Sequence, residues 1–190
     1  GLAEGDVYAA IEGVVGSRFD DQLAGDAGSN KLNGGAGRDT MAGGGGDDIY
    51  VIDNAGDMII EAGGAAGGAD KVVSTVVDLL LASNIETGKL LGILDLDLTG
   101  NSGANRLQGN DGGNAIEGGG GADIMRGGNG ADSFVYRGLS DSPSSAGQDW
   151  ILDFQAGEDT IDLSLIDANG SGAGDTSFLF LDGEGAAFSG

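Results

Sequence analysis

The chain has 190 residues, of which 41 are Gly and one is Pro, and it contains neither Cys nor His. Without Cys and His there is no zinc site of the usual kind, no catalytic triad, no thiol nucleophile, no haem ligation through either residue and no disulfide framework. Asp and Glu number 31 against 8 Lys and Arg, so the net charge is −23, which argues against nucleic acid and anionic membranes as direct partners and favours cations.

The N-terminal end shows no recognisable targeting segment. Residues 1–20 lack the basic start and apolar core of a cleavable signal, and no apolar run approaches the ~18 residues of a membrane span. Membrane insertion is therefore not expected. The chain begins and ends with Gly, which suggests a piece excised from a longer protein. Hydrophobic residues make up 39% of the chain, a low share for a conventional core of this size, so we expect something else to help hold the fold together.

A nine-residue repeat begins at Gly16. Its copies are GSRFDDQLA (16–24), GDAGSNKLN (25–33), GGAGRDTMA (34–42), GGGGDDIYV (43–51) and IDNAGDMII (52–60), the last without its Gly pair. The sixth position of the copies is an acidic or amide column: Asp21, Asn30, Asp39, Asp48 and Asp57. The eighth position is an apolar column: Leu23, Leu32, Met41, Tyr50 and Ile59.

Residues 61–99 keep strand character but lose the nine-residue period. Apolar and β-branched clusters occur at 72–77, 79–81, 90–91 and 94–98. Within this segment GGADKV (67–72) preserves a fragment of the repeat loop, with Asp70 two residues before Val72.

The repeat returns at residue 100. The copies are GNSGANRLQ (100–108), GNDGGNAIE (109–117), GGGGADIMR (118–126) and GGNGADSFV (127–135). Their sixth positions are Asn105, Asn114, Asp123 and Asp132, and their eighth positions are Leu107, Ile116, Met125 and Phe134.

Each nonamer is interpreted as a turn followed by a very short strand. Gly permits positive φ and a tight loop whose carbonyls point inward, and the last three residues form a strand with one apolar side chain. Such a strand cannot bury its apolar residue alone, so the copies must stack into a parallel β-solenoid with the apolar column lining a narrow core. Carboxylates stacked in the sixth column would repel one another unless cations lay between them. We therefore expect bound cations to be part of the fold.

After Arg137 the period ends, and the single Pro, Pro143, lies in a Ser-rich loop. The segment DWILDFQAGEDTIDLSLID (149–167) alternates apolar and acidic residues, which predicts two strands joined by the QAGED turn. The side chains expected to pack inward are Trp150, Ile151, Phe154, Ile161 and Leu163. The candidates for a further ion, with solvated turn carboxylates as the alternative, are Asp149, Asp153, Asp159 and Asp162.

The loops GGAGRD (34–39), GGGGDD (43–48), GGGGAD (118–123) and GGNGAD (127–132) resemble the RTX nonapeptide GGxGxDxUx, a calcium-binding β-helix repeat. The resemblance implies an all-β fold, a right-handed parallel β-roll in which two nonamers make one turn and calcium lies between loops one turn apart. Residues 61–99 and the lead-in 3–21 resemble the spacer units between nonamer blocks of long RTX proteins. One continuous roll over 1–136 is therefore expected, with repeat blocks at 16–60 and 100–135 around the spacer, and repeats or another domain before Gly1.

The segment from Asp149 onward also resembles the C-terminal cap of serralysin-type metalloproteases and of alginate-epimerase modules, where DxIxDFxxGxDxIDLS follows the last nonamer. Residues 137–190 are therefore predicted to form a C-terminal β cap, with DTSFLFLDGEGAAFSG (175–190) as its next hairpin. A truncated cap is expected, because the chain stops before the terminal segment that carries the type I secretion signal in such proteins.

The family resemblance also implies where calcium binds. An ion takes the carbonyls of positions two and four and the side chain of position six from one loop, then the carbonyls of positions one and three and the position-six side chain from the loop two repeats later. In the first block, one site would use Ser17, Phe19, Asp21, Gly34, Ala36 and Asp39. A second would use Asp26, Gly28, Asn30, Gly43, Gly45 and Asp48. A third, whose later loop lacks the Gly pair, would use Gly35, Gly37, Asp39, Ile52, Asn54 and Asp57.

The second block would supply two further sites. One would use Asn101, Gly103, Asn105, Gly118, Gly120 and Asp123. The other would use Asn110, Gly112, Asn114, Gly127, Asn129 and Asp132. Asn at 30, 105 and 114 offers a neutral oxygen where the pattern prefers Asp, so weaker binding is expected there. About five Ca²⁺ ions, each taking six to eight oxygen ligands, are the expected cofactors.

The leading functional hypothesis is a calcium-dependent folding module of a bacterial protein exported by a type I system. The charged calcium-free chain should stay expanded in the cell and fold outside it at ~10⁻³ M calcium, stabilising an upstream effector or enzyme domain. The alternative is a calcium-dependent module that binds polysaccharide or a cell surface, although no basic stripe is evident in the sequence. No catalysis is expected within these residues, because the zinc motif HExxHxxGxxH requires His. The active site of a parent protease, lipase or polysaccharide-modifying enzyme would lie upstream.

Overall fold

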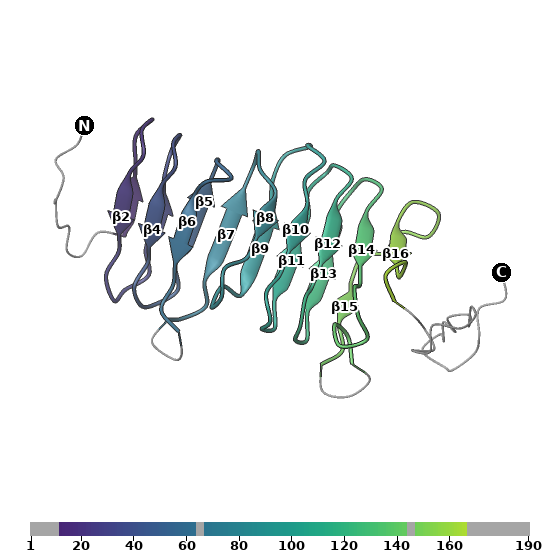
Figure 1. The fold of residues 1–190 in the computed structure, drawn as a ribbon. Coiled ribbons are helices and arrows are strands. Elements are labelled where there is room, and N and C mark those ends of the chain that lie inside the picture. The colour runs from purple at the N-terminus through teal and green to yellow at the C-terminus, as the bar shows by residue number, and fades with distance from the viewer. Residues whose placement is uncertain (1–11, 64–66, 144–146, 167–190) are drawn as a thin grey trace.

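The computed structural model describes residues 12–63, 67–143 and 147–166, and this part of the chain is all β, with no helix (Figure 1). The strands are β1 (Gly13–Val15), β2 (Gln22–Ala24), β3 (Lys31–Asn33), β4 (Thr40–Ala42), β5 (Ile49–Ile52), β6 (Met58–Ile60), β7 (Lys71–Ser74), β8 (Leu79–Leu80), β9 (Thr87–Leu90), β10 (Leu98–Thr99), β11 (Arg106–Gln108), β12 (Ala115–Glu117), β13 (Ile124–Arg126), β14 (Ser133–Val135), β15 (Trp150–Ile151) and β16 (Thr160–Asp162). Most are three residues long, as the nonamer predicts.

Consecutive strands alternate between two faces of a coil whose turns lie side by side along the molecule in Figure 1. The odd-numbered strands from β1 to β15 form one continuous eight-stranded sheet. The opposite face is built from two shorter sheets, β2-β4-β6 and β8-β10-β12-β14-β16. Every strand pair is parallel. The predicted parallel β-solenoid is confirmed.

The register shows that two nonamers make one turn. In the first block Leu32 pairs with Tyr50, and in the second Leu107 pairs with Met125, each time two repeats apart. Equivalent residues of the repeat therefore stack directly on one another along the roll. This stacking brings loops that are two repeats apart in the sequence into contact.

The apolar column lines the space between the two faces, as predicted. Its buried members, each 0–1% exposed, are Leu32, Met41, Tyr50, Leu107, Ile116, Met125 and Phe134. Between the blocks the segment after residue 61 continues the same core with Val72, Leu79, Leu81, Ile85, Leu90, Leu96 and Leu98. Each such side chain contributes roughly 1.5–3 kcal/mol on burial, so one unbroken core runs through both repeat blocks.

The second face is interrupted where the nine-residue period is lost. β6 ends the three-stranded sheet and β8 begins the five-stranded one, and the two strands do not pair. The eight-stranded face crosses the same region without a gap, because β5 pairs with β7 and β7 pairs with β9. Strand pairing therefore continues through this region on one face only.

The residues after the second block extend the roll by further strands. β15 pairs with β13 on the long sheet, and β16 pairs with β14 on the opposite face. The prediction that Trp150 packs inward was wrong, because Trp150 is 63% exposed. Phe154 is 41% exposed, with its ring 6.3 Å from that of Phe134 between centroids, and Ile161 and Leu163 are half-buried. Phe134 fills the core at this end, and Ile151 packs against the core as predicted, whereas Trp150 stands on the outer side of its strand.

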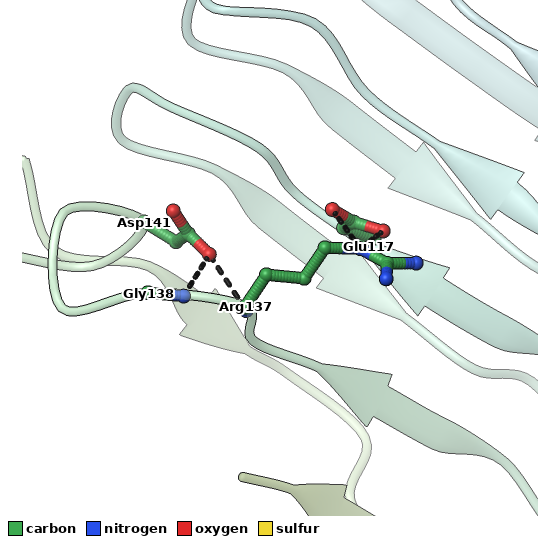
Figure 2. A network of polar contacts seen from close by, with 4 residues as sticks. All are labelled: Glu117, Arg137, Gly138 and Asp141. Carbon is green, nitrogen blue, oxygen red and sulfur yellow. Dashed lines mark hydrogen bonds and ion pairs between the residues drawn. The ribbon is translucent and has the colours of Figure 1, made fainter. Parts of the chain in front are cut away.

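A polar contact holds the loop that follows β14 (Figure 2). Arg137 Nε donates to both carboxylate oxygens of Glu117, at 2.8 and 2.7 Å. Asp141 accepts the backbone N–H groups of Arg137 and Gly138 at 2.8 and 2.9 Å, so its side chain closes the turn. The predicted hairpin at 175–190 and the part of the lead-in before residue 12 lie outside the described residues.

Candidate metal centre

The sixth-position side chains form a ladder of hydrogen bonds along the roll. The backbone N–H of a sixth-position residue donates to the carboxylate Oδ1 of the sixth-position residue one turn later, 18 residues along the chain. The pairs, donor first, with N···O distances of 2.7–2.9 Å, are Asp21–Asp39, Asp39–Asp57, Asn30–Asp48, Asn105–Asp123 and Asn114–Asp132. One oxygen of each accepting carboxylate is thereby fixed, and the other is directed into the stack of loops.

The second oxygen of most of these carboxylates has no hydrogen-bond partner. Oδ2 is buried and unpartnered in Asp39, Asp48, Asp123 and Asp132. Their side chains are 0–2% exposed, so water does not solvate the charge. A buried carboxylate oxygen without a partner costs several kcal/mol. The unsatisfied oxygens fit the expected cation, because an ion beside them would supply the missing partner.

Gly at the first position of each loop leaves room where predicted ligands converge. A Cβ on Gly100 would overlap the carbonyl oxygen of Gly118 and lie 2.6 Å from Oδ1 of Asn105. A Cβ on Gly118 would overlap Oδ2 of Asp123. Three predicted ligands of one site, Gly118, Asn105 and Asp123, thus lie where a side chain on Gly100 or Gly118 would otherwise be. The pairs that meet in the same way at the other sites are Asp21 with Gly34, Asn30 with Gly43, and Asn114 with Gly127.

Gly at the second and fourth positions lets successive loops pack closely. In the later loop of each of four sites both residues have positive φ: Gly35, Gly37, Gly44, Gly46, Gly119, Gly121, Gly128 and Gly130. Each lies against the backbone carbonyl group of the equivalent residue one turn earlier. Those carbonyls belong to the predicted ligands Ser17, Phe19, Asp26, Gly28, Asn101, Gly103, Asn110 and Gly112.

The third-position residues lie at the outer edge of the loops. Ala36 and Asn129 are exposed, and Gly45 and Gly120 are half-buried. Gly45 donates its N–H to the carbonyl of Asp26 at 2.8 Å, and Gly120 donates to that of Asn101 at 3.1 Å. A carbonyl oxygen has two lone pairs, so these bonds leave one for another partner.

The third predicted site of the first block is built differently. Asp57 Oδ2 accepts the N–H groups of Asp53 and Asn54 at 3.2 Å, and Asn54 O accepts the N–H of Asp57 at 3.0 Å. The Arg38 side chain lies over Gly56, where a Cβ would be 2.6 Å from Nε. Asp39 donates its backbone N–H to Asp57 of this loop at 2.9 Å, and buried Ile52 lies at the start of the loop. Local hydrogen bonds thus satisfy Oδ2 of Asp57, whereas Oδ2 of the equivalent carboxylate in the later loop of the other four predicted sites has no hydrogen-bond partner.

The sixth-position Asn residues are satisfied by the protein itself. Asn105 Nδ2 donates to the Ile85 carbonyl at 3.0 Å, and Asn114 Nδ2 donates to the Leu96 carbonyl at 2.8 Å. Their Oδ1 atoms accept the second-position N–H of their own loops, as Oδ1 of Asn30 does. The turn of the roll before Asn105 and Asn114 has no nonamer loops. The side-chain amides of these two residues donate to backbone carbonyls of that turn, which a carboxylate would repel.

Burial raises the pKa of the ladder carboxyl groups. For Asp70 and Asp123 desolvation raises the pKa from 3.8 to about 6, against a backbone hydrogen bond that lowers it. The pKa values of Asp48 and Asp132 are also raised, by desolvation first and by neighbouring carboxylates second. In the absence of a cation these groups therefore take up protons at a higher pH than a carboxyl group in water does.

The ladder extends beyond the residues predicted from the repeat. The added pairs, donor first, with distances of 2.7–3.1 Å, are Asp48–Asp70, Asp70–Glu86, Asp123–Asp149 and Asp132–Asp159. Their separations are 22, 16, 26 and 27 residues, instead of 18 within the blocks. The nine-residue spacing could not find them. Three of the added acids have other signals in the sequence: the loop fragment around Asp70, and the acidic segment from residue 149 onward that made Asp149 and Asp159 candidates for a further ion.

The four acids proposed for a further ion near the C-terminal end do not form one group. Asp149 and Asp159 belong to the ladder. Asp153 accepts the N–H groups of Gly127 and Gly128 at 3.0 and 3.2 Å. Asp162 lies in β16, where hydrogen bonds from Ser164 lower its pKa.

The outer side of the eight-stranded sheet carries most of the cations. Its eight strands contain no Asp or Glu, in a chain with 31 acidic residues. They hold five of the 8 Lys and Arg: Lys31, Lys71, Lys89, Arg106 and Arg126. These residues are scattered in the sequence, where no basic stripe is evident; the coil brings them to one face, in alternate rows on neighbouring strands, since Lys89 pairs with Val73 and Arg106 with Thr87. Exposed Trp150 stands at the end of the same face.

Comparison with known proteins identifies related sequences. The profile of a family described as Peptidase M10 serralysin C terminal matches residues 8–182. A serralysin from Photorhabdus luminescens is 61% identical over 82 residues, which are 43% of this chain and 17% of that protein. The aligned stretch therefore covers less than a fifth of that relative's length. No helix in the described residues is long and apolar enough to cross a membrane.

Proposed function

This chain belongs to the C-terminal family of serralysin-type M10 peptidases, and from that membership we propose that it is a calcium-binding RTX module of a secreted bacterial protease. The peptidase active site would lie in an upstream domain of the same protein. The module would fold when calcium binds after export by a type I system, and it would then stabilise that domain. The serralysin relative supports a protease as the parent; nothing favours a lipase or a polysaccharide-modifying enzyme.

The observation that carries this proposal is the set of buried carboxylate oxygens without partners. Among the described residues they are Oδ2 of Asp39, Asp48, Asp70, Asp123, Asp132 and Asp149. All ligand candidates are oxygen atoms of carboxylates, amides or backbone carbonyls, the set that a hard cation such as Ca²⁺ prefers. When bound, calcium would supply charge neutralisation between the loops. The protein's own part is to hold the carboxylates in register through the backbone ladder.

Coupling to export follows from the charge. The net charge is −23 and there is little apolar surface to bury. The buried carboxylates therefore lower the stability of the folded calcium-free chain. Binding of ions to the folded state alone adds stability in proportion to the logarithm of their concentration. Low calcium inside the cell keeps the chain extended and fit for transport, and higher calcium outside drives folding.

Calcium counting by equilibrium dialysis, combined with sedimentation velocity, tests the proposal. The expected result is about five ions per chain, with half-saturation at ~10⁻⁴ to 10⁻³ M, and a compact particle only when the ions are bound. A chain that binds no calcium, or that is equally compact in chelator, would contradict it.

The basic face favours a second candidate function, binding of an acidic polysaccharide. A polyanion lying along the roll would meet Lys71, Lys89, Arg106 and Arg126 on four successive strands of the long sheet. The test is affinity electrophoresis in gels that contain a polyuronate or a neutral glucan. Retardation by the polyuronate alone, lost in Arg106→Ser/Arg126→Ser, supports this function. Equal mobility in both gels excludes it.

A further inference from the structure

The interruption of the second face contains a cluster of three carboxylates, of which one belongs to the nonapeptide pattern and two lie outside it. Glu61 follows β6 directly, at the point where the three-stranded sheet ends. One carboxylate oxygen each of Asp48, Glu61 and Asp70 lies within 4.8 Å of the others. Asp48 closes the last full loop of the first block, and Asp70 precedes β7 in the following segment. The cluster therefore lies where the two parts of the roll meet.

Two of the three carboxylates are buried with an oxygen that has no partner. Asp48 is 0% exposed and Asp70 is 1% exposed, and Oδ2 of each makes no hydrogen bond. Their Oδ1 atoms are already fixed, because Asp48 Oδ1 accepts the N–H of Asn30 and Asp70 Oδ1 accepts the N–H of Asp48, both at 2.7 Å. The free oxygens are thus held in place and lack only a ligand.

Tyr50 positions the third carboxylate. Tyr50 occupies the apolar column and is fully buried, yet its hydroxyl group accepts the N–H of Gly43 at 2.7 Å and donates to Oε2 of Glu61. Glu61 Oε1 accepts the N–H of Ala62 at 2.7 Å. In the other copies of the nonamer the same position holds Leu, Met, Ile or Phe, and none of these side chains can donate a hydrogen bond to a carboxylate. Tyr50 therefore places a hydrogen-bond donor in the core beside Glu61, where the first repeat block ends.

In the part of the chain that the structure describes, no side-chain cation pairs with the cluster. Within residues 12–63, 67–143 and 147–166 the one ion pair is Arg137 with Glu117, which is far along the chain. Three carboxylates at this separation repel one another strongly unless a cation lies among them. Protonation of one group would relieve the repulsion only in part.

We propose that Asp48, Glu61 and Asp70 bind a calcium ion that joins the first repeat block to the segment after it. The donors are all hard oxygens, and the chain has no His or Cys, so a zinc-type ion has no preferred ligand here. Carboxylates of different lengths from three separate elements suit the irregular coordination of Ca²⁺ better than the strict octahedron of Mg²⁺. The ion replaces the strand pairing that β6 and β8 do not make. This inference rests on the proposed function only for the identity of the cation.

The experiment counts ions in Glu61→Gln against a charge-matched control. Glu12→Gln removes the same charge at an exposed position outside the cluster. Calcium bound per chain is measured by equilibrium dialysis at saturating calcium, and Tb³⁺ luminescence sensitised by tyrosine serves as a second readout because Tyr50 touches the cluster. We expect Glu61→Gln to bind one ion fewer and to lose part of the Tb³⁺ signal. We expect Glu12→Gln to match the unsubstituted protein.

Full ion count and full Tb³⁺ signal in Glu61→Gln would overturn the inference. If that variant does not fold, Glu61→Asp keeps the charge but shortens the side chain, and affinity should fall about 10-fold or more at one site; unchanged affinity would again overturn it. Absence of calcium binding in the unsubstituted protein would instead refute the proposed function itself. The two failures are therefore distinguishable.

Discussion

The sixth-position carboxylate is the residue on which the account depends. Asp123 shows its two roles: Oδ1 accepts the N–H of Asn105 at 2.7 Å, and Oδ2 is buried with no partner. The first role aligns neighbouring turns, and the second gives a binding surface for a cation at a cost in stability. The nine-residue spacing predicts this residue, since it repeats without error in the block. It could not predict Asp149 or Glu86, because each occupies the same ladder at a spacing set by an irregular loop.

Replacement of Asp123 by Asn separates the two roles. An amide oxygen still accepts the ladder hydrogen bond, but the negative charge at the ion site is lost. We expect calcium affinity at that site to fall about 10–100-fold and the calcium-free protein to become more stable, because a buried charge has been removed. Calorimetric titration and urea unfolding in chelator measure the two effects. The control is Asp97→Asn, which changes an exposed carboxylate outside the predicted sites; equal behaviour of the two variants would refute the assigned role.

The raised pKa values predict how stability depends on pH. Burial raises the pKa of Asp70 and Asp123 from 3.8 to about 6, so the folded state binds protons more readily than the unfolded chain. Their contribution to the stability of the calcium-free roll is therefore full below about pH 4 and lost as pH rises through about 6. In chelator we expect β-structure to increase between pH 7 and pH 4.

Calcium affinity should depend on pH in the opposite direction, because protons compete with calcium for the same carboxylate oxygens. We expect affinity to decrease below pH 6. Circular dichroism in chelator and calcium titration at fixed pH values give the two curves. In the double variant Asp70→Asn/Asp123→Asn, the change of β-structure with pH and the change of calcium affinity with pH should both be smaller. Unchanged curves in this variant would assign the effect to other groups.

At the scale of the element, the loop is a stack of glycine turns whose close packing is needed for the site. The four loops with the complete Gly pattern show positive φ at the second and fourth positions. The sequence predicts those loops well, because only Gly adopts this backbone at little cost. It does not predict that residues 52–57 close with local hydrogen bonds and with Arg38 over Gly56, since that depends on which side chain lies one turn earlier.

Adjacent glycines of one loop give a matched pair of variants. Gly119 has φ +86 and a Cβ there would overlap the Asn101 carbonyl, whereas a Cβ on Gly120 would meet Ser102 only at 3.8 Å. We expect Gly119→Ala to destabilise the calcium-loaded protein by about 1–3 kcal/mol and Gly120→Ala to change little. Thermal unfolding in excess calcium measures both. A smaller loss for Gly119→Ala than for Gly120→Ala would show that the loops do not stack in this way.

The amide at the start of the second ladder is a further test at this scale. Asn105 Nδ2 donates to the Ile85 carbonyl at 3.0 Å and the residue is 3% exposed. Asn105→Asp places a carboxylate against that carbonyl, so we expect a loss of about 1–3 kcal/mol in the calcium-loaded protein. Gln22→Glu adds the same charge on an exposed strand position and should be near neutral. A more stable Asn105→Asp would mean that an ion, not the amide, fills this place.

At the scale of the whole molecule, charge is divided between the edges and one face of the roll. The acids lie mainly in the loops, and five of the 8 Lys and Arg lie on the eight-stranded sheet, which has no acid in its strands. Fold class and core were predictable because the period fixes which residues stack. The basic face was not, because Lys71, Lys89 and Arg106 come from segments of irregular length that only the coil brings onto one sheet. The exposed Trp150 was missed for the same reason.

The central claim is that calcium binding and folding of this chain are one event. Its most direct test is a far-UV circular dichroism titration with calcium from a chelated start at neutral pH, with magnesium as the control ion. The account predicts a coil-to-β transition at ~10⁻⁴ to 10⁻³ M calcium and none with magnesium. A β-rich spectrum in chelator that calcium leaves unchanged would contradict the account, because the buried carboxylates would then have no need of an ion.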